Sequence, residues 1–285
     1  MTMGNTNARG RIWFITGASS GFGRAVSEAA LKRGDTVVAT GRDLQEIETL
    51  FESRAERALP LRLDITDAGA VRTVIEQAVR RFGRLDVVFN NAGYGHVGAI
   101  EELTDDELRQ QIEVNLFGAI NVTRAALPYM RKQRSGHFLQ MSSLNGIEPL
   151  VGGAYYAASK FAIEGFSESL AGEVAHLGIK VTIIEPGPAR TRFLEDRSAK
   201  WAKPIPDYAA SVGKTRAMLR ELNSKQPVDP ARAARAIVEA VEADEPPLHL
   251  PLGHLALEHI RNEFSDRLGK LDTWRELSAT ADFAS

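Results

Sequence analysis

The chain has 285 residues, of which 44% are hydrophobic and 25% are charged, and its formal net charge is −2. This composition is typical of a globular protein with one large core or two small ones, and the charge gives no reason to expect binding to nucleic acid or to an anionic membrane. The absence of cysteine excludes disulfides, thiolate metal ligands and cysteine nucleophiles. The polar start does not resemble a signal peptide, and no apolar run approaches the roughly 18 residues of a membrane span. We therefore expect a cytoplasmic protein with a flexible N-terminus (residues 1–10) and no membrane segment.

The stretch from Ile12 to Arg24 predicts a dinucleotide-binding turn. Its apolar start is typical of a buried strand, and glycines follow at positions 17, 21 and 23 before a segment with helical spacing. The free N–H groups at a helix N-terminus attract an anion, and glycine lets the backbone approach a pyrophosphate where a Cβ would collide. Three glycines alone are a weak signal, because ordinary tight turns also contain them. Their position between a strand and a helix is the context that the motif requires.

The rest of the chain alternates strand-like and helix-like segments. We expect strands at residues 35–40, 61–64, 85–90, 137–142, 179–185 and 247–252. We expect helices at residues 44–58, 104–134 (disturbed near Pro128), 154–177, 207–222, 229–241 and 254–268. This alternation predicts the α/β class: one doubly wound Rossmann domain over residues 11–285, with a seven-stranded, mainly parallel sheet and helices on both faces. We interpret the insertion at about residues 188–226 as a substrate lid over the crevice at the carboxyl ends of the strands.

Tyr156 and Lys160 are the strongest candidates for catalysis. Residues four apart share one face of a helix, so the Lys160 ammonium can lie near the Tyr156 phenol and lower its pKa from about 10. Such a phenol could donate a proton to a carbonyl oxygen. By itself, a Tyr–Lys pair is more often an interfacial ring and a solvated amine. Three further residues add weight: Ser142 and Ser143 follow a strand, and Asn115 lies in an amphipathic helix, where a buried amide needs partners.

Together these segments resemble the short-chain dehydrogenase/reductase family. The resemblance extends over residues 12–191, whereas the later part is similar only in layout. It implies an oxidoreductase that transfers a hydride between a nicotinamide and a carbonyl or alcohol carbon. The matching motifs, in the family's order, are Thr16–Gly23 (TGASSGFG), Asn90–Gly93 (NNAG), Asn115, Ser142–Ser143, Tyr156-x-x-x-Lys160 and Pro186–Gly187.

The resemblance implies a role for each candidate catalytic residue. Tyr156 would be the general acid and base, and Lys160 would lower its pKa and hold the nicotinamide ribose. Ser143 lies at the family's usual separation from the tyrosine, so we choose it over the preceding serine. Tyr155 is a rival phenol, but only Tyr156 has a lysine four residues later. Asn115 would hold a water of the proton relay.

The resemblance also implies contacts with the cofactor. The glycine turn would hold the pyrophosphate, the end of the third strand would flank the adenine, and the loop after the sixth strand would bind the carboxamide. These contacts are Gly17, Ser19, Ser20, Gly21, Phe22, Gly23, Asp64, Ile65, Asn91, Ala92, Gly93, Tyr156, Lys160, Pro186, Gly187 and Thr191.

Arg42 favours NADP(H) over NAD(H). An NAD site places a carboxylate at the end of the second strand, but here Gly41 occupies the position that resembles the acidic one, and Arg42 follows it. A guanidinium can hold the 2′-phosphate through two hydrogen bonds, whereas a carboxylate would repel it. Asp43 leaves an alternative open, because it could turn inward and serve NAD or cap the next helix.

The expected substrate pocket is apolar. Tyr94, Leu144, Leu150 and Phe193 would line it, which favours a ketone, aldehyde or secondary alcohol on a hydrophobic body. The surroundings of Arg42, the segment 90–98 and the long insertion resemble the hydroxysteroid- and retinol-dehydrogenase-like branch of the family. No residues have metal-ligand spacing, so we expect no metal.

Three other functions remain open at this point. They are an NAD-dependent alcohol dehydrogenase working in the oxidative direction, a dinucleotide sensor without catalysis, and a nucleotide-dependent methyltransferase, which has no use for a Tyr-x-x-x-Lys pair. The helices expected at 104–134 and 154–177 carry more apolar residues than one sheet needs. In the family such helices pair between subunits, so we expect a homodimer or homotetramer.

Overall fold

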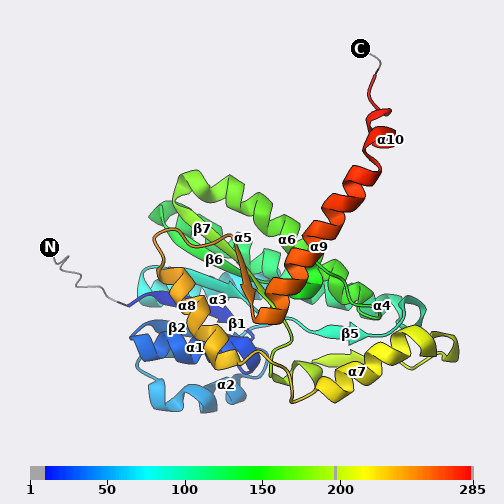
Figure 1. The fold of residues 1–285 in the computed structure, drawn as a ribbon. Helices are drawn as coiled ribbons and strands as arrows, with labels where there is room; N and C mark the ends of the chain where they lie inside the picture. Colours follow the sequence, from blue (N-terminus) through cyan, green and yellow to red (C-terminus); the bar gives the residue numbers. More distant parts are fainter. Residues whose placement is uncertain (1–9, 196–197, 284–285) are drawn as a thin grey trace.

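A seven-stranded sheet forms the centre of the computed structural model, which describes residues 10–195 and 198–283. All of its strands run parallel, in the order β3-β2-β1-β4-β6-β7-β9 (Figure 1). The predicted α/β class and Rossmann sheet are confirmed. The N-terminus expected to be flexible lies, apart from Gly10, outside the described residues. The strands are β1 (Ile12–Thr16), β2 (Thr36–Gly41), β3 (Ala58–Arg62), β4 (Val87–Asn90), β6 (Gly136–Met141), β7 (Ile179–Pro186) and β9 (His249–Leu252).

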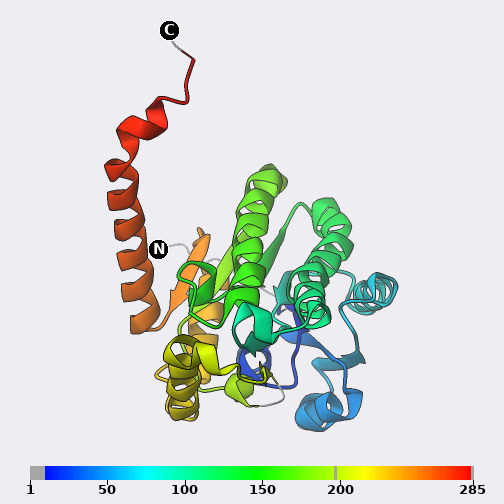
Figure 2. The same ribbon diagram turned by 90° about the vertical axis from the view of Figure 1, so that its right-hand side faces the viewer.

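Helices cover both faces of this sheet. Because side chains alternate along a strand, Trp13 and Ile15 enter the core under α1, α2 and α8, whereas Phe14 enters the core under α3, α5 and α6 (Figures 1 and 2). All three side chains are fully buried. The helices are α1 (Gly21–Arg33), α2 (Leu44–Phe51), α3 (Ala68–Phe82), α4 (Asp105–Ile112), α5 (Ala119–Gln133), α6 (Ala154–Val174), α7 (Lys214–Leu222), α8 (Pro230–Glu242), α9 (His254–Thr273) and α10 (Arg275–Ala279).

The helix expected at residues 104–134 is interrupted, but not at Pro128. Between α4 and α5 the chain forms a wider π-helical segment, η3 (Glu113–Gly118), whereas Pro128 lies inside α5. A π segment is usually a local bulge in a helix and often marks a functional site. This one contains Asn115, so the interruption lies at a residue that the sequence singles out for the reaction.

Two further expectations about boundaries were wrong. The helix predicted to reach residue 58 ends at Phe51, and Ala58 instead begins β3. The last long helix, α9, runs to Thr273 rather than to residue 268 and carries the chain away from the sheet (Figures 1 and 2). None of the helices in the described ranges is long and apolar enough to cross a membrane.

A small second sheet, which the sequence did not predict, joins the insertion to the body. β5 (Gly95–Val97) follows β4, and it pairs in parallel with β8 (Ala199–Trp201) inside the insertion. Each strand has three residues, too few for an alternating pattern to stand out. The insertion is therefore hydrogen-bonded to the segment that leaves the carboxyl end of β4.

The strand order places the functional crevice between β1 and β4. The chain moves outward from β1 through β2 to β3 and then returns to β4 on the other side of β1. In a doubly wound sheet, this reversal leaves a crevice at the carboxyl ends of the strands. The glycine turn after β1 and the NNAG segment after β4 both lie there.

His137 predicts a pH-dependent loss of stability. Its Nε2 atom lies 2.9 Å from Thr182 Oγ1, and burial, with smaller contributions from Lys180 and Arg11, lowers its pKa from 6.5 to about 3. Below pH 6.5 the histidine is protonated in the unfolded chain but stays neutral in the folded chain. The folded state is therefore fully stable, with respect to this group, above pH 6.5, and it loses stability as the pH falls toward 3. Between pH 6.5 and 5 the free energy of unfolding, measured by urea denaturation, should fall by about 2 kcal/mol less in His137→Gln than in the wild-type protein. Identical pH slopes in the two proteins would contradict this account.

Candidate active site

The glycine turn leaves room for a phosphate next to the end of β4. Gly17 and Gly21 have φ of 65° and 54°, values that favour glycine. A Cβ at Gly17 would lie 3.0 Å from the Ala92 Cα, and one at Gly23 would lie 2.3 Å from the Gly17 carbonyl oxygen. Ser20 precedes α1 at its N-cap position without using its hydroxyl to cap the helix. The turn therefore offers a helix N-terminus, a spare hydroxyl and no Cβ atoms to obstruct a pyrophosphate.

The NNAG segment is fixed against this turn by hydrogen bonds. Asn91 donates from its side chain to the carbonyl oxygens of Thr16 (2.8 Å) and Gly17 (3.2 Å). The Thr16 hydroxyl in turn accepts the backbone N–H groups of Asn91 and Ala92, both at 3.0 Å. A Cβ at Gly93 would lie 3.1 Å from Asn115 Oδ1. These contacts hold the two sides of the crevice at a fixed separation, as a dinucleotide site requires.

The end of β2 presents a cation where a carboxylate would serve NAD. Arg42 is exposed, and its charge acts on both Asp64 and Tyr94 across the crevice. Asp43 instead begins α2 and accepts the Glu46 N–H at 3.1 Å. Of the two roles that the sequence left open for Asp43, the structure shows the helix cap.

The residues expected beside the adenine lie after β3. A Cβ at Gly118 would lie 2.4 Å from the Ile65 Cδ1, so Ile65 packs directly on the π segment. Asp64 accepts the Thr66 N–H at 3.0 Å and its hydroxyl at 2.8 Å. Partial burial raises the pKa of Asp64, but these bonds and the charges of Arg42 and Arg62 leave it below its ordinary value. An ionised carboxylate therefore stands at this side of the crevice.

Lys160 and Tyr156 lie on α6 at the carboxyl end of β6. The buried Lys160 donates from Nζ to the Met141 carbonyl oxygen at 2.6 Å, and Nζ lies 5.6 Å from the centroid of the Tyr156 ring. Burial lowers the pKa of Lys160 to about 8, although Glu164 opposes this change. Burial raises the pKa of Tyr156 to about 12, against a hydrogen bond from Ser143 that lowers it.

The pKa of Tyr156 thus lies above its ordinary value of about 10, whereas the Tyr–Lys spacing predicted a value below it. Removal of the phenol from water outweighs nearby stabilising contacts, because burial disfavours the phenolate. At neutral pH Tyr156 therefore carries its proton. That protonation state suits an acid that donates a proton to a substrate oxygen.

The structure distinguishes the two candidate serines and the two candidate tyrosines. Ser143 faces Tyr156, and its hydroxyl also accepts the Asn145 N–H at 3.1 Å. The Ser142 hydroxyl instead lies near Gly146 and Glu164. A Cβ added at Gly146 would be less than 3 Å from both the Ser142 Oγ and a Glu164 carboxylate oxygen. The Tyr155 hydroxyl donates to the Ile100 carbonyl oxygen at 3.0 Å and so faces away from Ser143.

Asn115 clamps the chain beneath Tyr94. Its Oδ1 accepts the Tyr94 N–H at 3.0 Å, and its Nδ2 donates to the Tyr94 carbonyl oxygen at 2.8 Å and to Ser159 Oγ at 3.0 Å. The polar network that a buried Asn requires is therefore present. The Oδ1 and Nδ2 atoms of Asn115 both have protein partners, and the role of Asn115 in holding a relay water stays a prediction.

Phe193 and Thr191 extend from the insertion into the crevice. The Phe193 ring centroid lies 5.5 Å from that of Tyr156, and a Cβ at Gly95 would touch both rings, at 3.2 and 3.3 Å. Thr191 begins the short helix η6 (Arg192–Leu194) and lies 3.6 Å from where a Gly21 Cβ would stand. The insertion thus contacts both the glycine turn and the candidate acid.

The remaining residues that we expected to line the substrate pocket lie on separate segments. Leu144 begins the short helix η4 (Leu144–Gly146), and Leu150 follows it, with both side chains half-buried. The Tyr94 ring lies under Lys200 Nζ at 4.8 Å, while its buried hydroxyl has no hydrogen-bond partner among the described residues. β7 ends at Pro186, and the next residue, Gly187, donates its N–H to the Leu252 carbonyl oxygen at 3.0 Å.

Sequence reasoning missed the ion pair that anchors the insertion. Arg216 on α7 pairs with Glu102, and their side chains are 9% and 0% exposed. Glu102 also accepts the N–H groups of Ala99 (2.6 Å) and Ile205 (2.7 Å). No local signal marks this pair, because its members are 114 residues apart.

Comparison with known proteins identifies the family. The family model described as short chain dehydrogenase matches residues 11–202. The chain belongs to the short-chain dehydrogenase family. It is therefore an NAD(P)-dependent oxidoreductase that acts on small molecules, as the sequence predicted, and the alternative of a methyltransferase is excluded.

Two relatives of this dehydrogenase show how far the similarity extends. Oxidoreductase BOA17 of Botryotinia fuckeliana is 39% identical, over 94% of this chain and 98% of its own length. A 3-ketodihydrosphingosine reductase of Bacteroides thetaiotaomicron is 36% identical, over 86% of this chain and 88% of its own. The names of these two relatives do not point to the hydroxysteroid or retinol branch.

Solved structures agree on the fold. A short-chain dehydrogenase from Streptomyces avermitilis has a TM-score of 0.89 and 41% identity, over 95% of this chain and 100% of its own. ElxO with NADP bound has a TM-score of 0.73 and 26% identity, over 87% and 99%. A family member from Burkholderia phymatum in complex with NAD has a TM-score of 0.81 and 23% identity, over 92% and 95%, which shows the fold alone. One of these structural neighbours thus holds NADP and another holds NAD.

Proposed function

We propose that this short-chain dehydrogenase is an NADP(H)-dependent reductase of ketones or aldehydes carried on a hydrophobic body. One observation carries the proposal: Tyr156, Ser143 and Lys160 meet beside the NNAG segment, which is hydrogen-bonded to the glycine turn, and Phe193 packs against Tyr156. A dinucleotide sensor would need the turn but not these three side chains. The whole of residues 11–285 forms the catalytic unit in this proposal, with residues 188–226 as its lid.

The site residues polarise the carbonyl and deliver a proton. Ser143 donates a hydrogen bond to the substrate oxygen, and Tyr156 donates its proton to that oxygen as it becomes an alcohol. The bound cofactor supplies a hydride to the carbonyl carbon. Lys160, which is charged below its pKa of about 8, stabilises the transient negative charge on Tyr156 and holds the ribose beside it. Phe193 and Leu150 exclude water from the reacting atoms.

The substrate class is tested by the loss of reduced-nicotinamide absorbance with steroid, retinoid, long-chain, aryl and aliphatic carbonyls. The apolar lining supports a hydrophobic substrate, and one relative is named for reducing the ketone of a long-chain base. We expect kcat/KM to rise with the apolar area of the carbonyl compound. Higher rates on steroids or retinoids would support the hydroxysteroid and retinol branch. A preference for sugar phosphates would contradict the proposed substrate class.

Arg42→Asp should reverse the cofactor preference. Wild-type protein is expected to favour NADPH over NADH, because Arg42 presents a guanidinium at the end of β2 while the Asp43 carboxylate caps α2. Hydrogen bonds to charged groups are worth about 1.5–3 kcal/mol, so the ratio of kcat/KM values should change about 10- to 100-fold. Arg54→Asp makes the same charge change beyond the far end of α2 and should leave the ratio intact. An unchanged ratio in Arg42→Asp would refute the NADP assignment.

We also propose that the protein assembles as a homo-oligomer, and that α9 contributes to the interface besides the helices that the sequence indicated. Phe117, in the segment 104–134, is 47% exposed, and Phe264, Leu268 and Leu271 on α9 are 48–65% exposed. A contiguous apolar stripe of this kind marks an interaction surface, and a second copy presents the same stripe. Trp274 and Leu277 extend it beyond the helix.

Charges on this stripe should dissociate the oligomer. We expect light scattering after size exclusion to give more than one chain per particle for wild type and a monomer for Leu268→Glu with Leu271→Glu. The matched variant Asn262→Glu with Ser265→Glu places the same charges at exposed polar positions of α9 and should keep the wild-type mass. A monomeric wild-type protein at micromolar concentration would contradict the proposal.

A further inference from the structure

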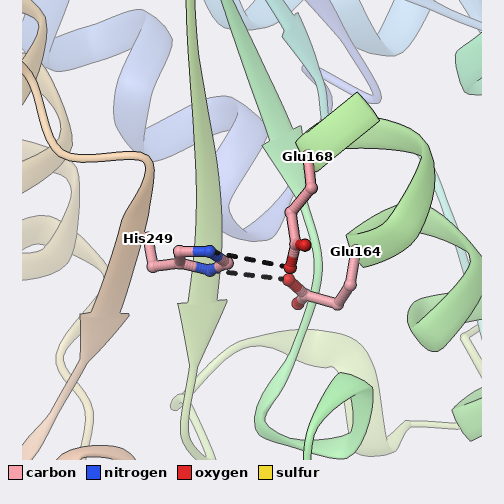
Figure 3. A group of neighbouring side chains, drawn as sticks. All are labelled: Glu164, Glu168 and His249. Carbon is pink, nitrogen blue, oxygen red and sulfur yellow. Dashed lines mark ion pairs between the residues drawn. The ribbon is translucent and has the colours of Figure 1, made fainter. Parts of the chain in front are cut away.

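A cluster of titratable side chains lies behind the active site, on the side of α6 that faces the sheet edge. Glu164 and Glu168 are one helical turn apart and share a face of α6, and His249 reaches them from the edge strand β9 (Figure 3). Their ligand atoms all lie within 4.8 Å of one another. Glu185 of β7 lies against the same imidazole. The reaction proposed above uses none of these four residues.

The imidazole of His249 is oriented by a buried carboxylate. Its Nδ1 lies 2.7 Å from Oε1 of Glu185, whose side chain is 2% exposed. With the proton on Nδ1, the lone pair of Nε2 is directed toward Glu168, whose Oε1 lies 3.7 Å away. A carboxylate that fixes the tautomer of a histidine in this manner is the usual outer partner of a metal-bound imidazole.

The buried side chain of Glu164 is a second observation that indicates a ligand site. Its side chain is 7% exposed, it is directed into the cluster, and neither carboxylate oxygen has a hydrogen-bond partner among the described residues. Oε2 lies 3.8 Å from His249 Nδ1, too far for a hydrogen bond. A buried carboxylate without hydrogen bonds is costly, because the protein replaces none of the lost contacts with water.

The cluster also gathers three acidic side chains around one imidazole. Lys160, which precedes Glu164 by one helical turn, is bonded to the Met141 carbonyl oxygen. A divalent cation placed between Glu164, Glu168 and Nε2 would give the Glu164 side chain the partner that it lacks among the described residues. Nε2 of His249 lies 3.7 Å from Glu168 Oε1, and all three ligand atoms lie within 4.8 Å of one another, so a contraction of the cluster would bring them to the ligand spacing of a tetrahedral ion whose bonds are about 2.0–2.2 Å.

We propose that Glu164, Glu168 and His249 bind one divalent transition-metal ion of the zinc type, with Glu185 as the outer partner of the histidine. One imidazole nitrogen and two carboxylate oxygens suit Zn²⁺ better than Mg²⁺, which prefers an all-oxygen octahedral site. An entry path exists, because Glu168 and His249 are 55% and 40% exposed. The ion would link α6, which carries Tyr156 and Lys160, to the edge strand.

The test is a Zn²⁺ titration of the full-length protein after treatment with a chelator and desalting, read by competition with a chromophoric zinc indicator. We expect about one Zn²⁺ per chain, and an affinity at least 10-fold weaker in Glu168→Gln and in His249→Gln. Glu185→Gln should lose about 10- to 100-fold, as loss of an outer partner usually does. The matched control is His259→Gln, since His259 also contacts a carboxylate, Glu148 at 2.7 Å, but only one.

The control separates this site from general binding of zinc by surface histidines. Wild-type affinity in His259→Gln, together with an X-ray absorption spectrum showing one imidazole and carboxylate oxygens at about 2.0–2.2 Å, would support the proposal. It is overturned if His249→Gln binds Zn²⁺ as tightly as wild type, if Mg²⁺ competes equally, or if no Zn²⁺ binds. Circular dichroism of each variant without metal confirms that it is folded, so lost affinity cannot arise from unfolding.

Discussion

Replacement of Tyr156 by phenylalanine should reduce kcat/KM for NADPH-dependent carbonyl reduction by about 10²- to 10⁴-fold, the usual contribution of a positioned general acid. The phenol holds its proton at neutral pH, because burial raises its pKa to about 12, and it lies beside Ser143 and Phe193. Phenylalanine keeps the ring contact with Phe193 and removes only the donor. We therefore expect NADPH to bind Tyr156→Phe with close to wild-type affinity, measured by fluorescence titration.

Tyr155→Phe is the matched control for that variant. It removes a hydroxyl from the adjacent residue, where the hydroxyl donates to the Ile100 carbonyl oxygen instead of facing Ser143. Turnover in Tyr155→Phe should stay within a few-fold of wild type. If the two variants lose activity to the same extent, the assignment of Tyr156 as the acid is wrong.

Replacement of Arg216 by methionine should lower the free energy of unfolding by about 3 kcal/mol. Loss of one partner from a buried ion pair costs about 3–5 kcal/mol, and this pair, which lies close to the surface, belongs at the lower end of that range. The variant leaves the carboxylate of Glu102, whose side chain is fully shielded from solvent, without its guanidinium. Urea denaturation gives the change, and the insertion that Arg216 anchors should become more sensitive to proteolysis.

Two further variants distinguish a buried charge from a lost contact. Adding Glu102→Gln to Arg216→Met removes the uncompensated charge and should recover part of the lost stability. Arg192→Met breaks the pair with Glu46, in which Arg192 is 45% exposed, and should change stability by no more than about 1 kcal/mol. Equal losses in Arg192→Met and Arg216→Met would contradict the assigned role of burial.

Features that depend on neighbours in the chain could be predicted. The glycine turn after β1 was recognisable because a strand, the glycines and a helix start follow one another within Ile12–Arg24. Tyr156 and Lys160 could be paired because the helix itself sets their spacing. The seven-stranded sheet followed from the alternation of elements, and the solved structures confirm that fold.

Features that depend on distant parts of the chain could not be predicted. The β5–β8 pair joins residues about a hundred positions apart, and the same is true of Glu102 and Arg216. The choice between the two roles of Asp43 depended on the direction of one side chain. The pKa of Tyr156 depends on how completely the fold removes the phenol from water, which the spacing to Lys160 does not reveal.

The most direct test of the proposed function is the fate of a deuterium carried by the cofactor. A carbonyl compound that the protein reduces is incubated with NADPH deuterated at the transferred position, and the alcohol is analysed by mass spectrometry. We expect one deuterium on the carbinol carbon, formation of the product at least 10²-fold slower with Tyr156→Phe, and slower formation when NADH replaces NADPH. An alcohol without deuterium, or product formed equally fast by Tyr156→Phe, would show that this site does not carry out the reaction.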